Sequence, residues 1–428
     1  VFGGPVGLRR DGRGGAGRLW GGRMIDRADV VVIGSGGLGA ATAFYLAASG
    51  RRSVAVIDKH EVASQTSPRA AGFVSCARKS DVMISLVKTA SDHLRRFTDE
   101  TGQPLDWVHP GSLKIARRPQ DASVIAGDLA RGRRMGLDVE EISPAEAHRL
   151  NPFLTGDGIA AAMRVGDDMY FNPAQVAIGF ARGAAARGAT LLPNTTATRV
   201  VIEAGKVTGV ETDRGTIRTP VVVDAAGAWT RQMAEASGLR IPLVPTRHQL
   251  FVTAPIDGVR PDLPMVRIMD AAVYVRPCDG GLLWGVFEEG PRFLDMETLG
   301  PWFDIKDTPL DAGVLRRAAA DVRAEMPVLE TAKVREHRGG IPTMTPDGEH
   351  IVGPAPAAEG FFFASGCNVA GLSISPALGG ALAAWINDGR PPIDLSELSP
   401  ARFGERRWAE DQLQRDAAWQ YHHFYGAV

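Results

Sequence analysis

The feature that most constrains the fold is a glycine-rich loop, Gly34-Ser35-Gly36-Gly37-Leu38-Gly39, which directly follows a short apolar run. Residues 29–33 of that run are too uniformly apolar for a half-exposed strand and predict a buried parallel strand. A helix is predicted over 38–49, closed by Gly50, and a second buried strand over 53–57. The folded chain therefore begins with a predicted strand–helix–strand unit.

The loop matches the G-x-G-x-x-G pattern of dinucleotide-binding folds, and Asp58 ends the second strand 19 residues after Gly39. Gly34 allows the tight turn, Gly36 lets a pyrophosphate approach the backbone, and Gly39 lets the helix pack closely on the sheet. The helix N-terminus offers unpaired N–H groups to the phosphates, and Asp58 can accept hydrogen bonds from ribose hydroxyls. The alternative is a glycine-rich turn that holds no ligand.

The segment after Asp58 distinguishes between two cofactors. Residues 64–72, Ser-Gln-Thr-Ser-Pro-Arg-Ala-Ala-Gly, are mostly small or hydroxyl-bearing and would let the chain run close to a long, extended cofactor. A nicotinamide enzyme would more usually have a helix at this point. The sequence therefore favours FAD over NAD, and it disfavours FMN, which lacks the adenosine half that the loop and Asp58 would hold.

The balance of charge excludes some classes of partner. Lys plus Arg number 48 against 49 for Asp plus Glu, so no overall basic field exists to hold nucleic acid. Cys76, Cys278 and Cys367 are too far apart in the sequence to suggest a disulfide framework or a zinc site. We therefore expect no metal and a reducing compartment, the cytoplasm.

Two segments differ in amino-acid composition from the rest of the chain. Residues 1–23 are rich in Gly and Arg and lack the apolar core of a secretory signal, so they predict a disordered leader, with a transit peptide as the alternative. Residues 360–386 carry no charge and are long enough to span a bilayer. Their serines, glycines and Pro376 instead predict a buried strand, a glycine-rich turn and a helix capped by Ser375, with no membrane span.

Periodicity predicts the remaining elements. An amphipathic helix is expected over 82–99, with Ile84, Val87, Leu94 and Phe97 on its buried face. Strands are expected over 197–202, 205–212, 215–219 and 221–224, and an antiparallel set over 245–290.

Together these motifs resemble the D-amino-acid-oxidase-like superfamily of FAD-dependent oxidoreductases and, within it, the dimethylglycine and sarcosine dehydrogenase group. Besides the loop and residues 64–72, the resemblance rests on Asp-Ala-Ala-Gly-Ala-Trp at 224–229, Thr-Pro-Asp-Gly at 345–348, and the segment 366–373. It covers about residues 28–425. The fold that it implies is α/β (α+β), a Rossmann-like FAD-binding domain with an inserted, mainly antiparallel-sheet substrate domain.

The resemblance also implies how the domains divide the chain. The discontinuous FAD-binding domain is expected at 24–90, 160–240 and 330–398, the substrate domain at 91–159 and 241–329, and a C-terminal tail at 399–428. Longer members of the group continue into a folate-binding domain, which we do not expect here because the chain ends at Val428.

Cofactor-binding residues are implied in each of the motifs. The segment 366–373 would lie beside the flavin ring and offer N–H groups to N1 and the C2 carbonyl, where negative charge develops on reduction. Ordinary helix capping, and packing for Trp229, remain alternatives. The full set is Gly34, Ser35, Gly36, Gly37, Leu38, Gly39, Asp58, Lys59, Ser64, Thr66, Ser67, Arg69, Ala70, Ala71, Gly72, Val200, Ala226, Gly227, Trp229, Gly340, Gly366, Asn368, Val369, Ala370, Gly371, Leu372 and Ser373.

The chemistry implied by the resemblance is hydride transfer to flavin N5 from a carbon next to an amine nitrogen, followed by hydrolysis of the imine. His248 and Tyr274 match the active-site His and Tyr of the group and are the expected catalytic residues; a structural His and a core Tyr are the alternatives. Arg276 alternates in phase with Tyr274 and is expected to pair with a substrate carboxylate, with a surface Arg as the alternative.

The expected partners are a small amine or N-methyl amino acid and an electron acceptor, either O2 or a carrier protein. Two other activities stay open, a 2-hydroxy-acid or D-amino-acid dehydrogenase and a flavoprotein subunit of a larger complex. Pro342 stands where D-amino-acid oxidases carry an Arg for the substrate carboxylate, which disfavours plain D-amino-acid oxidation.

The same resemblance predicts that FAD is not covalently bound. Arg69 stands where the dimethylglycine group has a His that bonds the ring methyl, and a protonated guanidinium cannot be that nucleophile. Gly340 stands where monomeric sarcosine oxidases place a Cys. Cys367, in the turn expected beside the ring, is the rival attachment site.

Overall fold

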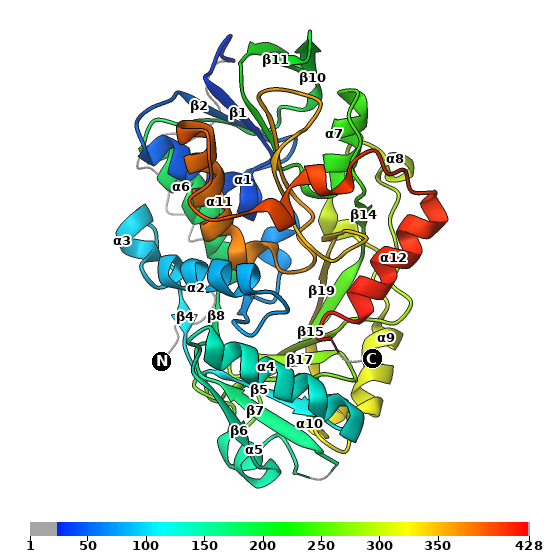
Figure 1. The fold of residues 1–428 in the computed structure, drawn as a ribbon. Helices are drawn as coiled ribbons and strands as arrows, with labels where there is room; N and C mark the ends of the chain where they lie inside the picture. Colours follow the sequence, from blue (N-terminus) through cyan, green and yellow to red (C-terminus); the bar gives the residue numbers. More distant parts are fainter. Residues whose placement is uncertain (1–23, 157, 427–428) are drawn as a thin grey trace, which may run out of the picture.

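The computed structural model describes residues 24–156 and 158–426, and the predicted leader 1–23 lies outside the described residues. Two large sheets organise the described chain, one with six strands and one with eight. Figure 1 shows the six-stranded sheet with helices α1 (Gly37–Ala48), α6 (Pro173–Ala186) and α11 (Gly371–Asp388) at one end of the molecule. Helices α4 (Ala122–Arg134) and α5 (Pro144–Leu150) lie at the other end.

The six-stranded sheet confirms the predicted strand–helix–strand unit. Strand β1 pairs in parallel with β2 on one side and with β13 on the other, and only β21 is antiparallel to its neighbour. In spatial order the strands are β21 (Ile351–Pro354), β22 (Phe361–Ser365), β13 (Val222–Asp224), β1 (Val30–Ile33), β2 (Val54–Ile57) and β9 (Thr190–Leu192).

Both faces of this sheet are buried, which explains the uniform apolar run at 30–33. Val30 and Val32 belong to a core cluster that also contains residues of α1, α6 and α11. Val31 and Ile33 belong to a second cluster, with residues of the antiparallel meander β10 (Ala197–Glu203), β11 (Lys206–Thr212) and β12 (Gly215–Arg218). A strand covered on both sides gains nothing from alternating polar residues.

Helices α1 and α11 are in backbone contact, which requires a glycine at the crossing. A Cβ atom added to Gly379 would lie 2.7 Å from the carbonyl carbon of Ala41 and 2.7 Å from the amide nitrogen of Thr42. The first turns of the two helices also meet, because a Cβ on Gly37 would lie 2.8 Å from Cδ1 of Leu372. The two helix N-termini are therefore held side by side.

The prediction that Ser375 caps helix α11 is wrong, because the helix begins four residues earlier, at Gly371, with Ala370 as its N-cap. Pro376 consequently lies inside the helix and cannot donate a hydrogen bond to the carbonyl oxygen of Leu372. The hydroxyl of Ser375 donates to that oxygen instead, at 2.9 Å. The Ser375 hydroxyl therefore replaces the backbone donor that Pro376 lacks, inside the helix and not at its N-terminus.

The helix predicted over 82–99 is two helices, α2 (Asp81–Arg95) and α3 (Phe97–Thr101), separated at Arg96. Ser80 caps the first helix by accepting a hydrogen bond from the amide of Met83. The four apolar residues expected on its buried face are all buried: Ile84, Val87, Leu94 and Phe97.

The eight-stranded sheet is mixed and mainly antiparallel, as expected. One face packs its apolar side chains, among them Phe251, Val275 and Trp284, against helix α9 (Ala312–Asp321), and the other face bounds the cavity described below. In spatial order its strands are β19 (Val334–Gly340), β15 (His248–Thr253), β18 (Gly281–Val286), β17 (Val273–Cys278), β16 (Met265–Ile268), β5 (Ser112–Ala116), β7 (Ala161–Val165) and β6 (Val139–Ile142).

Strands β7 and β19 both belong to the eight-stranded sheet, where β7 pairs with β5 and β6 and β19 pairs with β15, although the expected boundaries group them with the cofactor-binding segments. The expected tail contains α12 (Glu410–His422), whose buried residues pack against that sheet (Figure 1).

No helix within 24–156 or 158–426 is long and apolar enough to cross a membrane. The smaller elements are β3 (Phe73–Val74), β4 (Trp107–Val108) and β8 (Met169–Phe171) in one sheet, β14 (Val244–Pro245) and β20 (Thr343–Met344) in another, and helices α7 (Thr230–Ala236), α8 (Met296–Leu299) and α10 (Val328–Thr331).

The helix crossing gives a prediction with a matched control in the same helix. Gly379→Ala should lower the free energy of unfolding by about 1–3 kcal/mol, since the added methyl overlaps the backbone of α1. Gly380→Ala meets only the ring of Tyr45, at 3.8 Å, and should be neutral or stabilise by up to ~1 kcal/mol through helix propensity. Denaturant unfolding of both variants measures the difference, and equal stabilities would contradict the assigned crossing.

Candidate functional site

The main cavity lies between the N-termini of α1 and α11 and one face of the eight-stranded sheet. Its empty volume is about 1320 Å³, which includes the open space at its mouth. The predicted cofactor residues in its wall are Gly36, Gly37, Leu38, Thr66, Ser67, Arg69, Ala70, Ala71, Gly72, Gly227, Gly340, Val369, Ala370, Gly371, Leu372 and Ser373.

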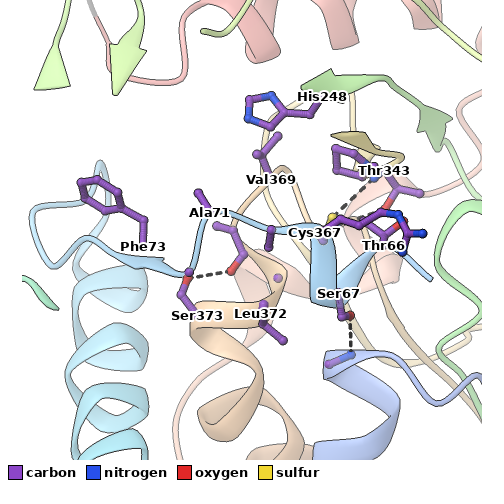
Figure 2. Close-up of a pocket in the computed structure, with 18 of the residues that line it drawn as sticks. Thr66, Ser67, Ala71, Phe73, His248, Thr343, Cys367, Val369, Leu372 and Ser373 are labelled. Atoms are coloured by element: carbon purple, nitrogen blue, oxygen red, sulfur yellow. Dashed lines mark hydrogen bonds between the residues drawn. The ribbon is translucent and has the colours of Figure 1, made fainter. Parts of the chain in front are cut away.

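The glycine-rich loop has the geometry that a pyrophosphate requires. Gly34 has φ +97°, which favours glycine, and any Cβ on Gly39 would overlap the carbonyl oxygen of Gly34. Gly36, the N-cap of α1, has no side chain to block a phosphate. A Cβ there would lie 3.3 Å from Oγ of Ser67. The Ser67 hydroxyl accepts a hydrogen bond from the amide of Gly37 at 2.9 Å, which ties the segment 64–72 to the start of α1 (Figure 2).

The turn before α11 is strained and lines the cavity. Asn368 and Val369 have φ of +41° and +62°, and the left-handed region is costly for a β-branched residue. The Asn368 side chain holds this turn by accepting from the amide of Thr345 at 3.0 Å and donating to the carbonyl of Gly366 at 2.8 Å. The first residues of α11 follow in the cavity wall, and their N–H groups have no partners within the helix.

These features fit FAD. Two helix N-termini with their positive dipole ends open on one cavity, and the loop leaves room for a phosphate against the backbone. Figure 2 shows Ser67 and Leu372 by the helix starts and His248 on the other side of the cavity. A flavin ring beside residues 369–373 and a pyrophosphate at Gly36 would occupy this arrangement.

Several predicted cofactor residues lie outside the cavity wall. Asp58 is held by its own neighbours, since Oδ2 accepts from the amide of Ser35 at 2.8 Å and Oδ1 from the amide of His60 at 2.9 Å. Burial raises the pKa of Asp58, and these hydrogen bonds oppose that shift. Also outside the wall are Gly34, Ser35, Gly39, Lys59, Ser64, Val200, Ala226, Trp229, Gly366 and Asn368.

Some of these outlying residues contact each other. The ammonium of Lys59 lies 3.7 Å from the centre of the Trp229 ring and donates to the carbonyl of Pro301. The indole N–H of Trp229 is buried without a partner among the described residues. The amide of Val200 donates to the hydroxyl of Ser237. Their role toward a cofactor therefore stays a prediction.

His248 and Tyr274 meet in the cavity wall and form a hydrogen-bonded chain. His248 Nε2 lies 2.8 Å from the phenol oxygen of Tyr274, and Nδ1 lies 2.7 Å from the phenol oxygen of Tyr421 in α12. Gly285 lies directly opposite Tyr274 on the next strand, and a Cβ there would be 2.6 Å from Cζ of Tyr274. The absence of a side chain at Gly285 lets the phenol reach across the sheet to the imidazole.

Burial lowers the pKa of His248 to about 3, so the imidazole is neutral at physiological pH. A neutral imidazole has one donor and one acceptor nitrogen. Tyr421 donates to the carbonyl of Arg247 at 3.4 Å, which leaves its oxygen to accept from Nδ1–H of His248. We therefore assign Nε2 as the acceptor of the Tyr274 proton, and the Tyr274 oxygen retains lone pairs for a ligand.

Arg276 and Arg69 are both occupied with backbone carbonyls. Arg276 lies outside the cavity wall, donates to the carbonyls of Ala71 at 2.6 Å and Pro277 at 2.7 Å, and stacks near the ring of Tyr170. Arg69 lines the cavity, but its Nη1 donates to the carbonyls of Ser64 and Gln65. The structure therefore does not bring Arg276 together with His248 and Tyr274 in the cavity wall.

The structure adds residues that sequence reasoning missed. Arg78 and Arg267 line the same cavity as His248 and Tyr274, and the aromatic side chains of Phe73, Phe287, Phe424 and Tyr425 enclose it. The sequence signal for these residues is the aromatic cluster at 419–425, within the expected C-terminal tail 399–428. A helix that returns from the C-terminus to a distant sheet leaves no local trace in the sequence.

Comparisons with known proteins agree on the family. The family model for DAO, FAD dependent oxidoreductase, matches residues 29–385. Human mitochondrial sarcosine dehydrogenase is 32% identical over 405 residues, which cover 92% of this chain and 44% of that protein. The mouse mitochondrial pyruvate dehydrogenase phosphatase regulatory subunit is 30% identical over 389 residues, 88% of this chain and 43% of that protein. The chain spans less than half the length of these curated relatives.

The fold comparison gives the same result. The crystal structure of L-proline dehydrogenase from P. horikoshii superposes with a TM-score of 0.80 at 25% sequence identity. The match covers 90% of this chain and all of that one. The expected fold class, a Rossmann-like domain combined with a mainly antiparallel sheet, is confirmed by the strand pairing and by this likeness.

The assigned neutral state of His248 gives a prediction for NMR. With its pKa lowered to about 3, the imidazole carbon signal of His248 should not move between pH 5 and pH 8, whereas a free His titrates near ~6.5. Protein labelled with 13C-histidine measures this, and His248→Asn identifies the signal by its loss. His350, whose pKa burial also lowers to about 3, is an internal control. A midpoint near ~6.5 for His248 would contradict the assignment.

Proposed function

The chain belongs to the family of FAD dependent oxidoreductases (DAO), and from this premise we propose that it oxidises the C–N bond of a small N-methyl amino acid, such as sarcosine or dimethylglycine. The observation that carries the proposal is the His248–Tyr274 pair, which lines the same cavity as the two helix N-termini. The likeness to sarcosine dehydrogenase supports the substrate class.

Bound FAD would supply the oxidising step by accepting a hydride from the carbon next to the amine nitrogen. Residues Gly36–Leu38 and Ser67 would hold the pyrophosphate, and residues 369–373 would donate N–H groups to the ring. Negative charge that develops near these N–H groups is stabilised without reorganisation, because the strained turn is already fixed by Asn368.

The chain's own residues would orient the amine. The Tyr274 hydroxyl donates to Nε2 of His248, so its oxygen can accept a hydrogen bond from the N–H of a neutral secondary amine such as sarcosine and fix the direction of the reacting C–H bond. Neutral dimethylglycine has no N–H, and the cavity wall alone would orient it. The neutral imidazole and the buried phenols offer no anion to a substrate ammonium group, and burial disfavours its charge, so the neutral, reactive amine is favoured. The aromatic enclosure excludes water from the reacting atoms.

Two parts of the proposal concern the setting of the enzyme. We expect O2 or a carrier protein to take the electrons, and a cytoplasmic location, although the relatives named above are mitochondrial. The likeness to a regulatory subunit favours a second candidate function, a flavoprotein subunit that acts within a larger complex. Flavin reduction by the purified chain separates the two candidates.

The substrate proposal predicts that sarcosine or dimethylglycine bleaches the bound flavin under anaerobic conditions, whereas lactate and D-alanine do not. His248→Ala and Tyr274→Phe should slow this reduction by about 10²–10⁴-fold while FAD stays bound. Stopped-flow absorbance of the flavin measures both effects.

Tyr45→Phe is the matched control, because it removes a phenol that lies outside the cavity wall and whose partner is Glu100 in α3, and it should leave the rate unchanged. Unchanged rates in both active-site variants would show that His248 and Tyr274 only pack. A flavin that none of the four compounds reduces would favour the regulatory candidate.

We also propose that FAD is bound without a covalent link. Gly340 and Arg69 offer no nucleophile, and the Cys367 thiol already accepts a hydrogen bond from the amide of Thr343 at 3.4 Å (Figure 2). Acid precipitation should therefore leave FAD in a yellow supernatant, identified by chromatography. Flavin fluorescence that stays with the polypeptide on a denaturing gel would refute this, and its loss in Cys367→Ala would identify the attachment site.

A further inference from the structure

We propose that Asp224 is a neutral carboxylic acid when FAD is bound, and that loss of its proton weakens the binding of FAD. The inference goes beyond the proposed function, since it concerns the cofactor and holds for any substrate. Asp224 is the last residue of β13 and pairs with Ile33, the last residue of β1. It therefore lies at the edge of the six-stranded sheet where the glycine-rich loop begins.

The side chain of Asp224 is buried, and only one oxygen of its carboxyl group has partners. The residue is 0% exposed. Oδ1 accepts from the amide of Ala226 at 3.0 Å and from the hydroxyl of Thr230 at 3.3 Å. Oδ2 is buried and has no hydrogen-bond partner among the described residues. An ionised carboxylate in this setting would leave negative charge on an oxygen that nothing solvates, which is costly.

No cation balances this carboxyl group within the described chain. Strands β1 and β22, the neighbours of β13 in the sheet, carry no titratable residue. Helix α7 and strand β11 also contact β13, and their charged side chains form ion pairs elsewhere: Arg231 with Glu235 and Glu410, Lys206 with Glu359, and Glu211 with Arg199.

Burial raises the pKa of Asp224 to about 7, and the hydrogen bonds from Ala226 and Thr230 to Oδ1 oppose that shift. Other carboxyl groups near the cavity have more partners. Asp168 and Glu288 each pair with an arginine, and Asp58 accepts hydrogen bonds on both of its oxygens. Asp224 therefore differs from them in having one oxygen without a donor.

Two hydroxyl groups connect Asp224 to the main cavity. The hydroxyl of Ser365, a residue of the cavity wall, donates to Oγ1 of Thr230 at 3.1 Å, and Thr230 donates to Asp224. The glycine-rich loop also touches the next residue, because a Cβ on Gly34 would lie 2.4 Å from the carbonyl oxygen of Ala225. The carboxyl group is thus two hydrogen bonds from the cavity, near the loop that would hold the pyrophosphate.

A negative charge on Asp224 would repel that pyrophosphate. Over roughly 10 Å, at an effective dielectric constant of about 20, the repulsion of two like charges equals about a 10-fold change in affinity. Bound FAD would therefore raise the pKa of Asp224 further. Below about pH 7 the acid is neutral with or without FAD, and binding is tightest. Above it the cofactor-free chain loses the proton, so FAD should bind more weakly as the pH rises.

The test is equilibrium dialysis of the FAD-loaded protein at pH values from about 6 to about 9. In the wild type the dissociation constant of FAD should rise by about 10-fold across this range. Asp224→Asn keeps the acceptor oxygen and has no charge, so its dissociation constant should stay at the wild-type value of the lowest pH. Thr230→Val removes a donor that stabilises the carboxylate, and the rise should move to higher pH.

Asp388→Asn is the matched control, because it makes the same change at an exposed residue, which ends α11 and pairs with Arg51. Its dissociation constant should follow the pH as in the wild type. Infrared spectroscopy supplies a second measurement. The difference spectrum between the wild type and Asp224→Asn, recorded near pH 6, should contain the C=O stretching band of a protonated carboxylic acid. If Asp224→Asn does not fold, the shift in Thr230→Val carries the assignment.

Three outcomes would overturn the inference. They are a wild-type dissociation constant that does not change with pH, the same rise in Asp224→Asn as in the wild type, and an infrared spectrum without the carboxylic-acid band. A flavin that stays on the protein at every pH also contradicts it. None of these measurements uses a substrate. A chain that passes them but oxidises no N-methyl amino acid would therefore support the inference while the proposed function fails.

Discussion

The cavity depends on the contact between the backbones of α1 and α11 at Gly379. Because the two helices touch there and again at Gly37 and Leu372, their N-termini open on the same space. Each N-terminus carries unpaired N–H groups and the positive end of a helix dipole. Two segments more than 300 residues apart in the sequence thus form one wall of the cavity, whose partial positive charge suits an anion.

The opposite wall depends on a second glycine. Gly285 leaves the space through which Tyr274 crosses the sheet to His248, and the pairing of β17 with β18 fixes that position. Helix α12 then places Tyr421 on the other side of the imidazole. Two phenols therefore hold His248, one from β17, on the far side of β18, and one from the C-terminal helix. Its neutral state follows from its burial.

The sequence predicted what local patterns encode. The loop at 34–39, the buried strands and the apolar face of α2 are set by neighbours in the chain, and the structure has them. The start of α11 was predicted wrongly from the sequence, because a Ser-Pro pair caps helices more often than it lies inside one. The sequence also gave no indication that Arg78 and Arg267 line the cavity. Whether an Arg is paired depends on acceptors such as Asp168, 99 residues away from Arg267, and no local pattern records that.

The distribution of charge around the cavity accounts for the kind of molecule that it can hold. Two helix N-termini and the guanidinium groups of Arg78 and Arg267 favour negative charge in the cavity, while the side chains of His248 and Tyr274 carry no formal charge. A zwitterionic amino acid would place its ammonium group in this uncharged region, where burial disfavours the charged form. Under the proposed function, the cavity would hold the amine in its neutral form, which is the protonation state from which a hydride can leave the carbon beside the nitrogen.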